Sequence, residues 1–425
     1  MSKCIKFFSF ILFLHILSAN SYAGEILSWE DCVKEAAKNH PDLIASVEQV
    51  KQSEAAKKIT ASTLYPQVNS NLSASTARTD TGTSSSTGDT YTYGVTGSQL
   101  LFDGTKTINN VKSASENITA AKQSYRFTSS QVRFRLRSAF VSLLKAQESL
   151  KITQDIFNIR RSNLELITLR YESGQEHKGA LLTAEANLAD AQYQISQAKR
   201  SVEVAQRDLV KEMGRVNLTP MQVSGNFEVA DAARQKPDFE ALVKNNPGLL
   251  QITAQKNAAD FGLKSSYANF SPTLSGQAGA NKSSSHWLPR NDQWNLGLIL
   301  SMPVFEGGLR LAQVSQARAL LNQLRENERS TKDGILLTLE QTWAVLQDAI
   351  ENVYVQKKTL IADEERAKIA DAEYSIGFIT FDNWTIIQDN LVSAKQSFLN
   401  AEANALLAEA AWIEAKGETV EYAKY

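Results

Sequence analysis

The sequence predicts a mostly α-helical chain with additional membrane β-strands, in which one structural unit occurs twice. The first observation is an internal repeat, because two short motifs recur at an offset of 203 residues. The second is a proline-free helical stretch of 67 residue steps in each copy, which at about 1.5 Å per residue is roughly 100 Å long. The third is a pair of strand-like segments before each long stretch. The repeated residues are Phe102 and Phe305, Gly104 and Gly307, Tyr171 and Tyr374, and Gly174 and Gly377.

Residues 1–23 predict a secretory signal peptide. Lys3 and Lys6 precede an apolar run, and Ser21-Tyr22-Ala23 is a small-x-small cleavage signal. The run is shorter than the about 20 residues that a membrane-spanning helix needs, and an uncleaved anchor is the alternative. After cleavage Cys32 is the single cysteine, so no intramolecular disulfide is expected even in an oxidising compartment.

Composition argues against a nucleic-acid partner and against catalytic activity. Loss of the two signal-peptide lysines changes the formal charge from −1 to −3, which is close to neutral for a chain of this length and does not favour a nucleic-acid partner. The histidines are scattered singly, without metal-ligand spacing. No nucleophile–base pair, paired carboxylates or phosphate-binding glycine loop stands out. The sequence therefore predicts a protein that is not an enzyme, without catalytic, cofactor or metal sites.

The first repeat is expected over residues 24–225. Ser28 is a candidate cap for a short helix, and Pro41 begins a second helix. After Pro66 the apolar period changes from 3.6 to 2, as in strands with one polar and one apolar face. From Gly104 the spacing is helical again, until a helix end at Gly214. The expected elements are helices 29–64, strands 66–78 and 91–102 around a Thr/Ser/Gly-rich loop 79–90, a long helix 104–172 and a return helix 177–214.

The second repeat, 247–417, follows a linker and equatorial segment, 226–246, and precedes a tail, 418–425. Its alternation is clearer, because Leu296, Leu298 and Leu300 alternate with Asn295, Gly297 and Ser301. We expect the leucines to face lipid and the other three residues to face a lumen. The expected elements are helix 247–270, strands 272–282 and 293–305, a long helix 307–374 and a return helix 381–417.

Strand number sets the expected assembly. The strands have nearly the 9 to 11 residues that a tilted membrane strand needs, and aromatic residues lie near their ends. Two soluble, half-buried hairpins are the alternative. Four strands cannot close around a lumen, and lipid does not tolerate an open sheet edge, so several protomers must pool their strands; three would give twelve.

Helix lengths predict where the smaller segments gather. A return helix and the shorter helix that precedes the strands, placed end to end, have together the length of one long helix. Their junction therefore falls partway along a tube. Residues 215–246, the segment 27–40 and the tail 418–425 would gather at that level as a girdle.

These features together resemble the TolC-like outer-membrane efflux protein family. The signal peptide, the duplicated halves, the Phe-x-Gly strand-to-helix junctions and the Tyr-x-x-Gly turns carry the resemblance, which covers essentially the whole mature chain. It implies a homotrimer in outer-membrane lipid with most of the chain in the periplasm, forming a twelve-stranded β-barrel above a long α-helical barrel. It also implies an exit duct of a tripartite efflux or type I secretion system, docked to a periplasmic adaptor and an inner-membrane transporter. The alternative is a secreted coiled-coil adaptor or scaffold without a pore.

The resemblance places gating and docking at the helical tips. The candidate tip residues are Tyr171, Gly174, Tyr374, Gly377, Phe378 and Asp382. Asp382 is the match to an acidic gate residue, although it or Thr380 could equally be a plain helix cap. The first-copy tip, 175–179, shows no obvious cap. Phe102, Gly104, Phe305 and Gly307 are the candidate strand-to-helix junctions.

Overall fold

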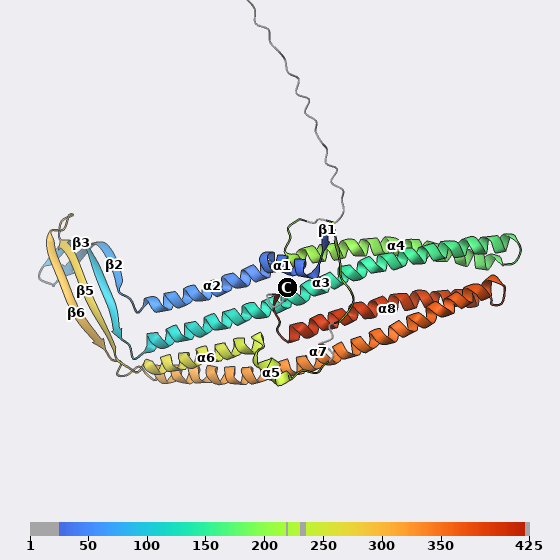
Figure 1. The fold of residues 1–425 in the computed structure, drawn as a ribbon. Coiled ribbons are helices and arrows are strands. Elements are labelled where there is room, and N and C mark those ends of the chain that lie inside the picture. Colours follow the sequence, from blue (N-terminus) through green and yellow to red (C-terminus); the bar gives the residue numbers. More distant parts are fainter. Residues whose placement is uncertain (1–24, 218–219, 230–234, 421–425) are drawn as a thin grey trace, which may run out of the picture.

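The computed structural model describes residues 25–217, 220–229 and 235–420. The expected signal peptide and residues 421–425 of the expected tail lie outside this part of the chain. Figure 1 shows an elongated bundle with a sheet at one end, two helical turns at the other and short elements around the middle.

The two repeats contain the same helices and strands in the same order. The first is built from α1 (Trp29–Asn39), α2 (Pro41–Ser62), β2 (Gln67–Asp80), β3 (Ser85–Phe102), α3 (Lys106–Glu172) and α4 (Lys178–Met213). The second is built from α5 (Phe239–Lys244), α6 (Pro247–Ala268), β5 (Thr273–Ser284), β6 (Asn291–Ser301), α7 (Leu309–Ser375) and α8 (Phe381–Ala415). Both long helices have 67 residues, and α2 and α6 both have 22.

Local sequence explains several helix ends. Ser28 caps α1 through a reciprocal capping box with Asp31. Pro41 and Pro247 occupy the first turns of α2 and α6, where a missing N–H costs nothing.

The strands form one antiparallel sheet in the order β2-β3-β5-β6, which leaves β2 and β6 as edges. Leu296 lies opposite Ala278 and Asn295 lies opposite Gly279. Since directly paired residues share a face, Leu296, Leu298 and Leu300 lie on one face of the sheet, together with Asp292, and Asn295, Gly297 and Ser301 lie on the other, together with Ile299.

The expected strand bounds were partly wrong. The expected loop 79–90 is mostly strand, because β3 begins at Ser85 and only residues 81–84 form the turn, with Gly82 at φ +78°. The hydroxyl-rich residues continue the ladder, and Thr76 Oγ1 donates to Asp89 at 2.7 Å across it. At the other end β6 stops at Ser301 rather than 305, before Pro303, which has no N–H to donate. Smaller shifts affect β2 and β5, which end two residues later than expected.

The strand-to-helix junctions use left-handed backbone in both repeats. Gly104 and Thr105 have φ of +64° and +70°, and Gly307 and Gly308 have +59° and +85°. A Cβ on Gly104 would lie 2.3 Å from Ser271 Cβ, so this glycine also permits close packing against the second repeat. Phe102 and Phe305 precede the junctions with exposed side chains.

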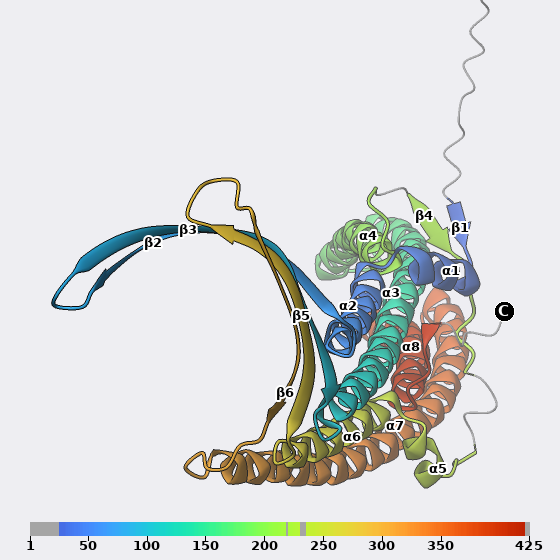
Figure 2. The same cartoon turned by 90° about the vertical axis from the view of Figure 1, so that its left-hand side faces the viewer.

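A girdle, defined here as residues 25–40, 214–217, 220–229, 235–246 and 418–420, lies along the middle of the bundle. Two unexpected strands, β1 (Glu25–Leu27) and β4 (Met221–Val223), pair in parallel there, and the expected linker contains α5. Cys32 and Val420 are fully buried with α3 residues in one apolar core, and burial raises the pKa of the Cys32 thiol to about 12. Figure 2 shows β1, β4, α1 and α5 on one side of the helical layer and the curved sheet on the other.

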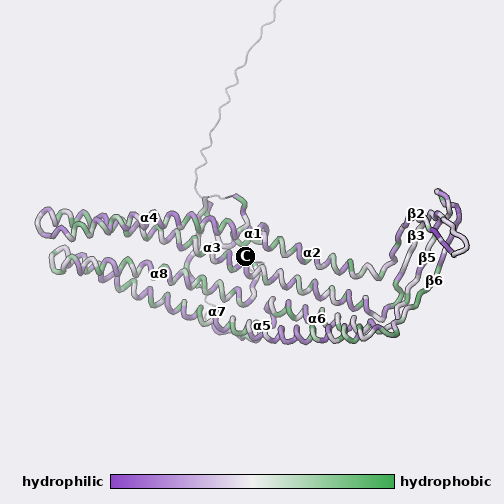
Figure 3. Tube along the Cα trace, turned by 180° about the vertical axis from the view of Figure 1, so that it is seen from behind, coloured by the Kyte–Doolittle hydropathy of each residue, from purple (hydrophilic) through white to green (hydrophobic). Residues whose placement is uncertain are grey.

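Hydropathy varies along each helix without a long apolar segment, as Figure 3 shows. Within the described ranges, none of the helices combines the length and apolarity needed to cross a membrane.

Candidate functional site at the helical tips

The two tips are tight turns built by glycine. Gly174, between α3 and α4, has φ +76°, and Gly377, between α7 and α8, has φ +80°. In each turn the glycine N–H donates to the carbonyl of the tyrosine three residues earlier, at 3.0 Å. A Cβ on either glycine would meet open space, so backbone conformation rather than packing requires glycine here.

The return helices are capped, but not as the sequence suggested. His177 Nδ1 accepts the Ala180 N–H at 3.1 Å, so the expectation that the first tip lacks a cap was wrong. Imidazole was overlooked because caps are usually Ser, Thr, Asp or Asn. In the second tip Thr380 Oγ1 accepts the Asn383 N–H at 3.3 Å. Asp382 therefore is not the cap; it lies exposed in the first turn of α8, where a negative charge is favourable.

Tyr374 lies at the centre of an apolar cluster that joins the two tips. Only 1% of its surface is exposed, whereas its repeat partner Tyr171 is 38% exposed and outside the cluster. The Tyr374 ring stacks on Trp384 with centroids 4.6 Å apart and an interplanar angle of 9°. The cluster comprises Ile167, Ala180 and Ala184 of the first repeat and Ala370, Tyr374, Phe381 and Trp384 of the second.

Polar contacts hold the same tyrosine to the first repeat. Its hydroxyl donates to Glu176 Oε1 at 2.7 Å. Arg170 donates from Nη1 to the Tyr374 carbonyl at 2.9 Å and places its guanidinium 4.6 Å from the ring centroid. Burial, followed by the hydrogen bond to Glu176, raises the pKa of Tyr374, so the hydroxyl stays protonated and can donate at any physiological pH.

A second set of hydrogen bonds fixes the stacking partner. Asp371 Oδ1 accepts from Trp384 Nε1 and from Gln388 Nε2, both at 2.7 Å. Further from the tip, Arg160 of α3 pairs with Asp389 of α8. The two hairpins of one chain are therefore held together near their tips by aromatic, hydrogen-bonded and ionic contacts.

Sequence reasoning found Tyr374 and both glycines but missed Arg170, Glu176 and Trp384. The available signal was departure from the repeat. At an offset of 203, Trp384 corresponds to Leu181, so the stacking partner exists in one copy only. Phe378 is exposed beyond the turn, with 76% of its surface accessible, and does not join the cluster.

Comparison with known proteins is consistent across sequence and structure. The family model described as "Outer membrane efflux protein" matches residues 32–215 and 240–418. Outer membrane efflux protein BepC of Brucella suis biovar 1 is 22% identical over 412 residues, covering 95% of this chain and 87% of BepC.

Solved structures show the same fold. A membrane protein from Pseudomonas aeruginosa superimposes with a TM-score of 0.84 at 17% identity, covering 93% of this chain and 92% of that one. The Campylobacter jejuni CmeC outer membrane channel superimposes with a TM-score of 0.80 at 17% identity, covering 91% of this chain and 84% of that one. Since the family model accounts for most of the sequence in two consecutive matches, the chain belongs to the outer membrane efflux protein family.

Proposed function

We propose that three copies of this chain form a passive exit duct through the outer membrane. The observation that carries the proposal is the four-stranded sheet with free edges at β2 and β6, attached to helices of 67 residues. An open sheet in lipid leaves backbone groups unpaired, and joining β2 of one protomer to β6 of the next removes both edges. Three protomers then supply twelve strands and a lumen.

The two faces of the sheet support this arrangement. The face with Leu296, Leu298 and Leu300 suits outer-membrane lipid, and the face with Asn295 suits water. Following the register, none of the strand residues that share the Asn295 face is charged. Amide, hydroxyl and small side chains therefore make up most of the lining of the proposed lumen, and Leu100 and Ile299 are its large apolar members.

The helical tips would close the periplasmic end and meet the partners. Ile376 and Phe378 are exposed at the second tip, 79% and 76%, and offer an apolar surface to a periplasmic adaptor that connects to an inner-membrane transporter. Exposed Asp382, repeated three times around the axis, would place acidic charge at the entrance. A pore-less coiled-coil adaptor should have β-rich domains flanking one helical hairpin, whereas this chain has two helical hairpins.

The assembly is tested by extracting the mature protein in detergent and measuring its mass by light scattering. We expect the mass of three protomers, and a monomer stable without detergent would refute the barrel. In planar bilayers we expect Asp382→Ala to increase single-channel conductance. Unchanged conductance would remove Asp382 from the gate without affecting the duct.

A further inference from the structure

In each repeat a return helix ends against the start of a half-length helix, near the middle of the molecule. Gly214 follows α4 with φ +75°, and a Cβ there would lie 2.4 Å from the Asn39 carbonyl oxygen. Gly417 follows α8 with φ +77°, and a Cβ there would lie 2.3 Å from Pro247 Cδ. Both joints are therefore closely packed, and each continues one half-helix into the other.

Equivalent residues, His40 and Asn246, make two corresponding contacts at these joints, but the second partner is a side-chain carboxylate for His40 and a backbone carbonyl for Asn246. His40 Nδ1 accepts the Asp42 N–H at 3.2 Å, and Nε2 lies 3.4 Å from Glu212 Oε2 at the end of α4. Asn246 Oδ1 accepts the Gly248 N–H at 2.9 Å, and Nδ2 donates to the Ala415 carbonyl at the end of α8 at 3.0 Å. Each side chain thus caps its own helix and holds the end of the return helix.

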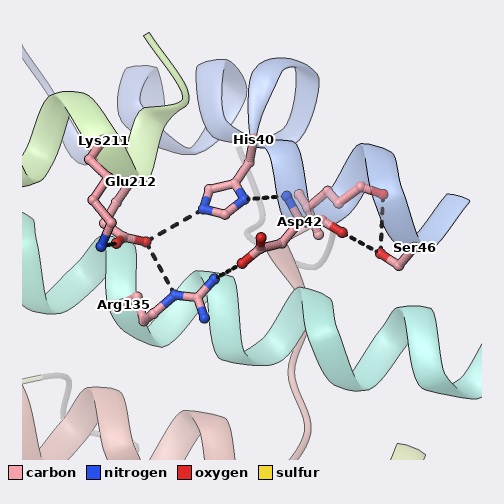
Figure 4. A network of polar contacts seen from close by, with 7 residues as sticks. His40, Asp42, Ser46, Arg135, Lys211 and Glu212 are labelled. Carbon is pink, nitrogen blue, oxygen red and sulfur yellow. Dashed lines mark hydrogen bonds and ion pairs between the residues drawn. The ribbon is translucent and has the colours of Figure 1, made fainter. Parts of the chain in front are cut away.

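Figure 4 shows the charged groups around His40. Arg135 of α3 contacts both Glu212, from Nε at 3.2 Å, and Asp42 of α2. Lys211 of α4 contacts Glu212 Oε1 at 2.6 Å. Burial alone would raise the pKa of Glu212, but the hydrogen bond from Lys211 and the charge of Arg135 outweigh it and keep the pKa below its usual range.

The remaining charges near the joint are of both signs, and Asp208 of α4 interacts with Lys211. Glu414 of α8 interacts with Arg135, and burial raises the pKa of its carboxyl. The last turn of α1 adds a further positive charge at Lys38. His40 itself is 4% exposed and lies at the positive N-terminal pole of α2. Arg135 and Lys211 already contact the carboxylate that His40 faces, so a proton added to the ring lies at Nδ1, opposite the Asp42 N–H and not opposite a carboxylate.

The position of the proton follows from the cap. Because Nδ1 accepts an N–H, it carries no proton, and the neutral ring must carry its hydrogen on Nε2, where it donates to Glu212. A second proton can bind only at Nδ1, which would then face another donor. Asparagine has no corresponding protonation state.

We propose that His40 makes the α4–α2 joint of the first repeat a pH-sensitive hinge, whereas Asn246 keeps the α8–α6 joint of the second repeat insensitive to pH. A proton added at Nδ1 of His40 on acidification removes the cap and loosens the first joint only. The part of the first repeat that contains α4 can then pivot relative to the part that contains α2 and the strands. This inference concerns the joint alone and holds whatever solute the duct conducts.

The test compares hydrogen–deuterium exchange of the full-length protein at pH 7.5 and 5.5, corrected for intrinsic exchange. We expect peptides around residues 40–46 and 208–214 to lose about fivefold in protection at pH 5.5, and peptides around 246–252 and 411–417 to lose none. His40→Asn should abolish the loss, and Asn246→His should create it in the second joint. Equal pH responses at both joints, or a response that survives in His40→Asn, would overturn the proposal.

Nitrogen-15 solid-state NMR of the unsubstituted protein gives an independent test that does not depend on the variants folding. With labelled histidine, the His40 ring should show the Nε2–H tautomer at pH 7.5. An Nδ1–H tautomer at pH 7.5 would contradict the proposal, because Nδ1 could not then accept the Asp42 N–H.

Discussion

Replacing Tyr374 by Phe removes one hydroxyl from the contact between the two helical tips. The ring can keep its 4.6 Å stack on Trp384, and the interaction of Arg170 with the ring and the backbone carbonyl remains. Only the 2.7 Å hydrogen bond to Glu176 is lost. The substitution therefore separates the hydrogen bond between the hairpins from the aromatic packing around it.

The expected magnitude follows from the environment of Glu176. Hydrogen bonds to charged groups contribute about 1.5–3 kcal/mol, and the low end applies because Glu176 is partly exposed and water can replace the phenol. About 1.5 kcal/mol corresponds to roughly a tenfold shift towards separated tips in each protomer.

Single-channel recording in planar bilayers measures this shift as open probability. Tyr171→Phe is the matched control, because it is the same chemical change at the repeat-equivalent position, where the hydroxyl has no hydrogen bond to any described residue. We expect Tyr374→Phe to open the channel more often and Tyr171→Phe to behave like the parent. Equal behaviour of the two variants would refute the role of the Tyr374–Glu176 contact in closure.

Three further predictions concern the rest of the molecule. Leu296→Arg should impair trimer assembly on native gels far more than Asn295→Arg, because a charge on the lipid face costs about 2–4 kcal/mol near the midplane. The reverse order would mean the other register, and equal effects would mean that the strand is not in the membrane. Gly214→Ala should lower the melting temperature more than Gly377→Ala, since both have positive φ but only the first meets a neighbour, and the reverse order would contradict the joint packing. The pKa of Glu212 is lowered in the folded protein, so its ionised carboxylate stabilises the fold above the ordinary carboxyl range, and this contribution is lost as pH falls through the folded pKa. Glu212→Gln should therefore make the free energy of unfolding depend less on pH below about pH 4.5. The same pH dependence in the variant and the parent would exclude this contribution of Glu212.

Much of the fold was predictable because the same sequence pattern occurs in both repeats. The turn glycines 174 and 377 and the prolines 41 and 247 specify helix ends through local backbone geometry, which sequence spacing reveals. The segment 79–90 was not predictable in the same way. Ser, Thr and Gly suit a solvated loop by composition, yet pairing with a neighbouring strand made most of it part of a ladder. Strand pairing depends on two segments, so the composition of one segment does not predict it.

The tip contacts were harder to predict for a related reason. Arg170 and Glu176 meet Tyr374 across about 200 residues of chain, so neither their spacing nor their residue types marked them as partners. Tyr374 was identified from its repeat, but the repeat also suggested an equivalent role for Tyr171, which lies outside the cluster. Shared positions in the two copies predicted the turn and not the contacts made by the side chains that flank it.

Shared positions and differing positions of the two repeats therefore have different structural roles. Positions that both copies share, such as the glycines after the long helices, fix a backbone geometry that each repeat needs to build the same shape. Positions where the copies differ, such as His40 with Asn246 and Leu181 with Trp384, lie at the two places where helices of different segments meet. If both joints carried histidine, they would respond to acid together, whereas under the proposed hinge only the first joint would loosen and the two hairpins would move relative to one another. Because the aromatic cluster joins those hairpins at the tips, strain introduced at the first joint would be borne by the contacts of Tyr374.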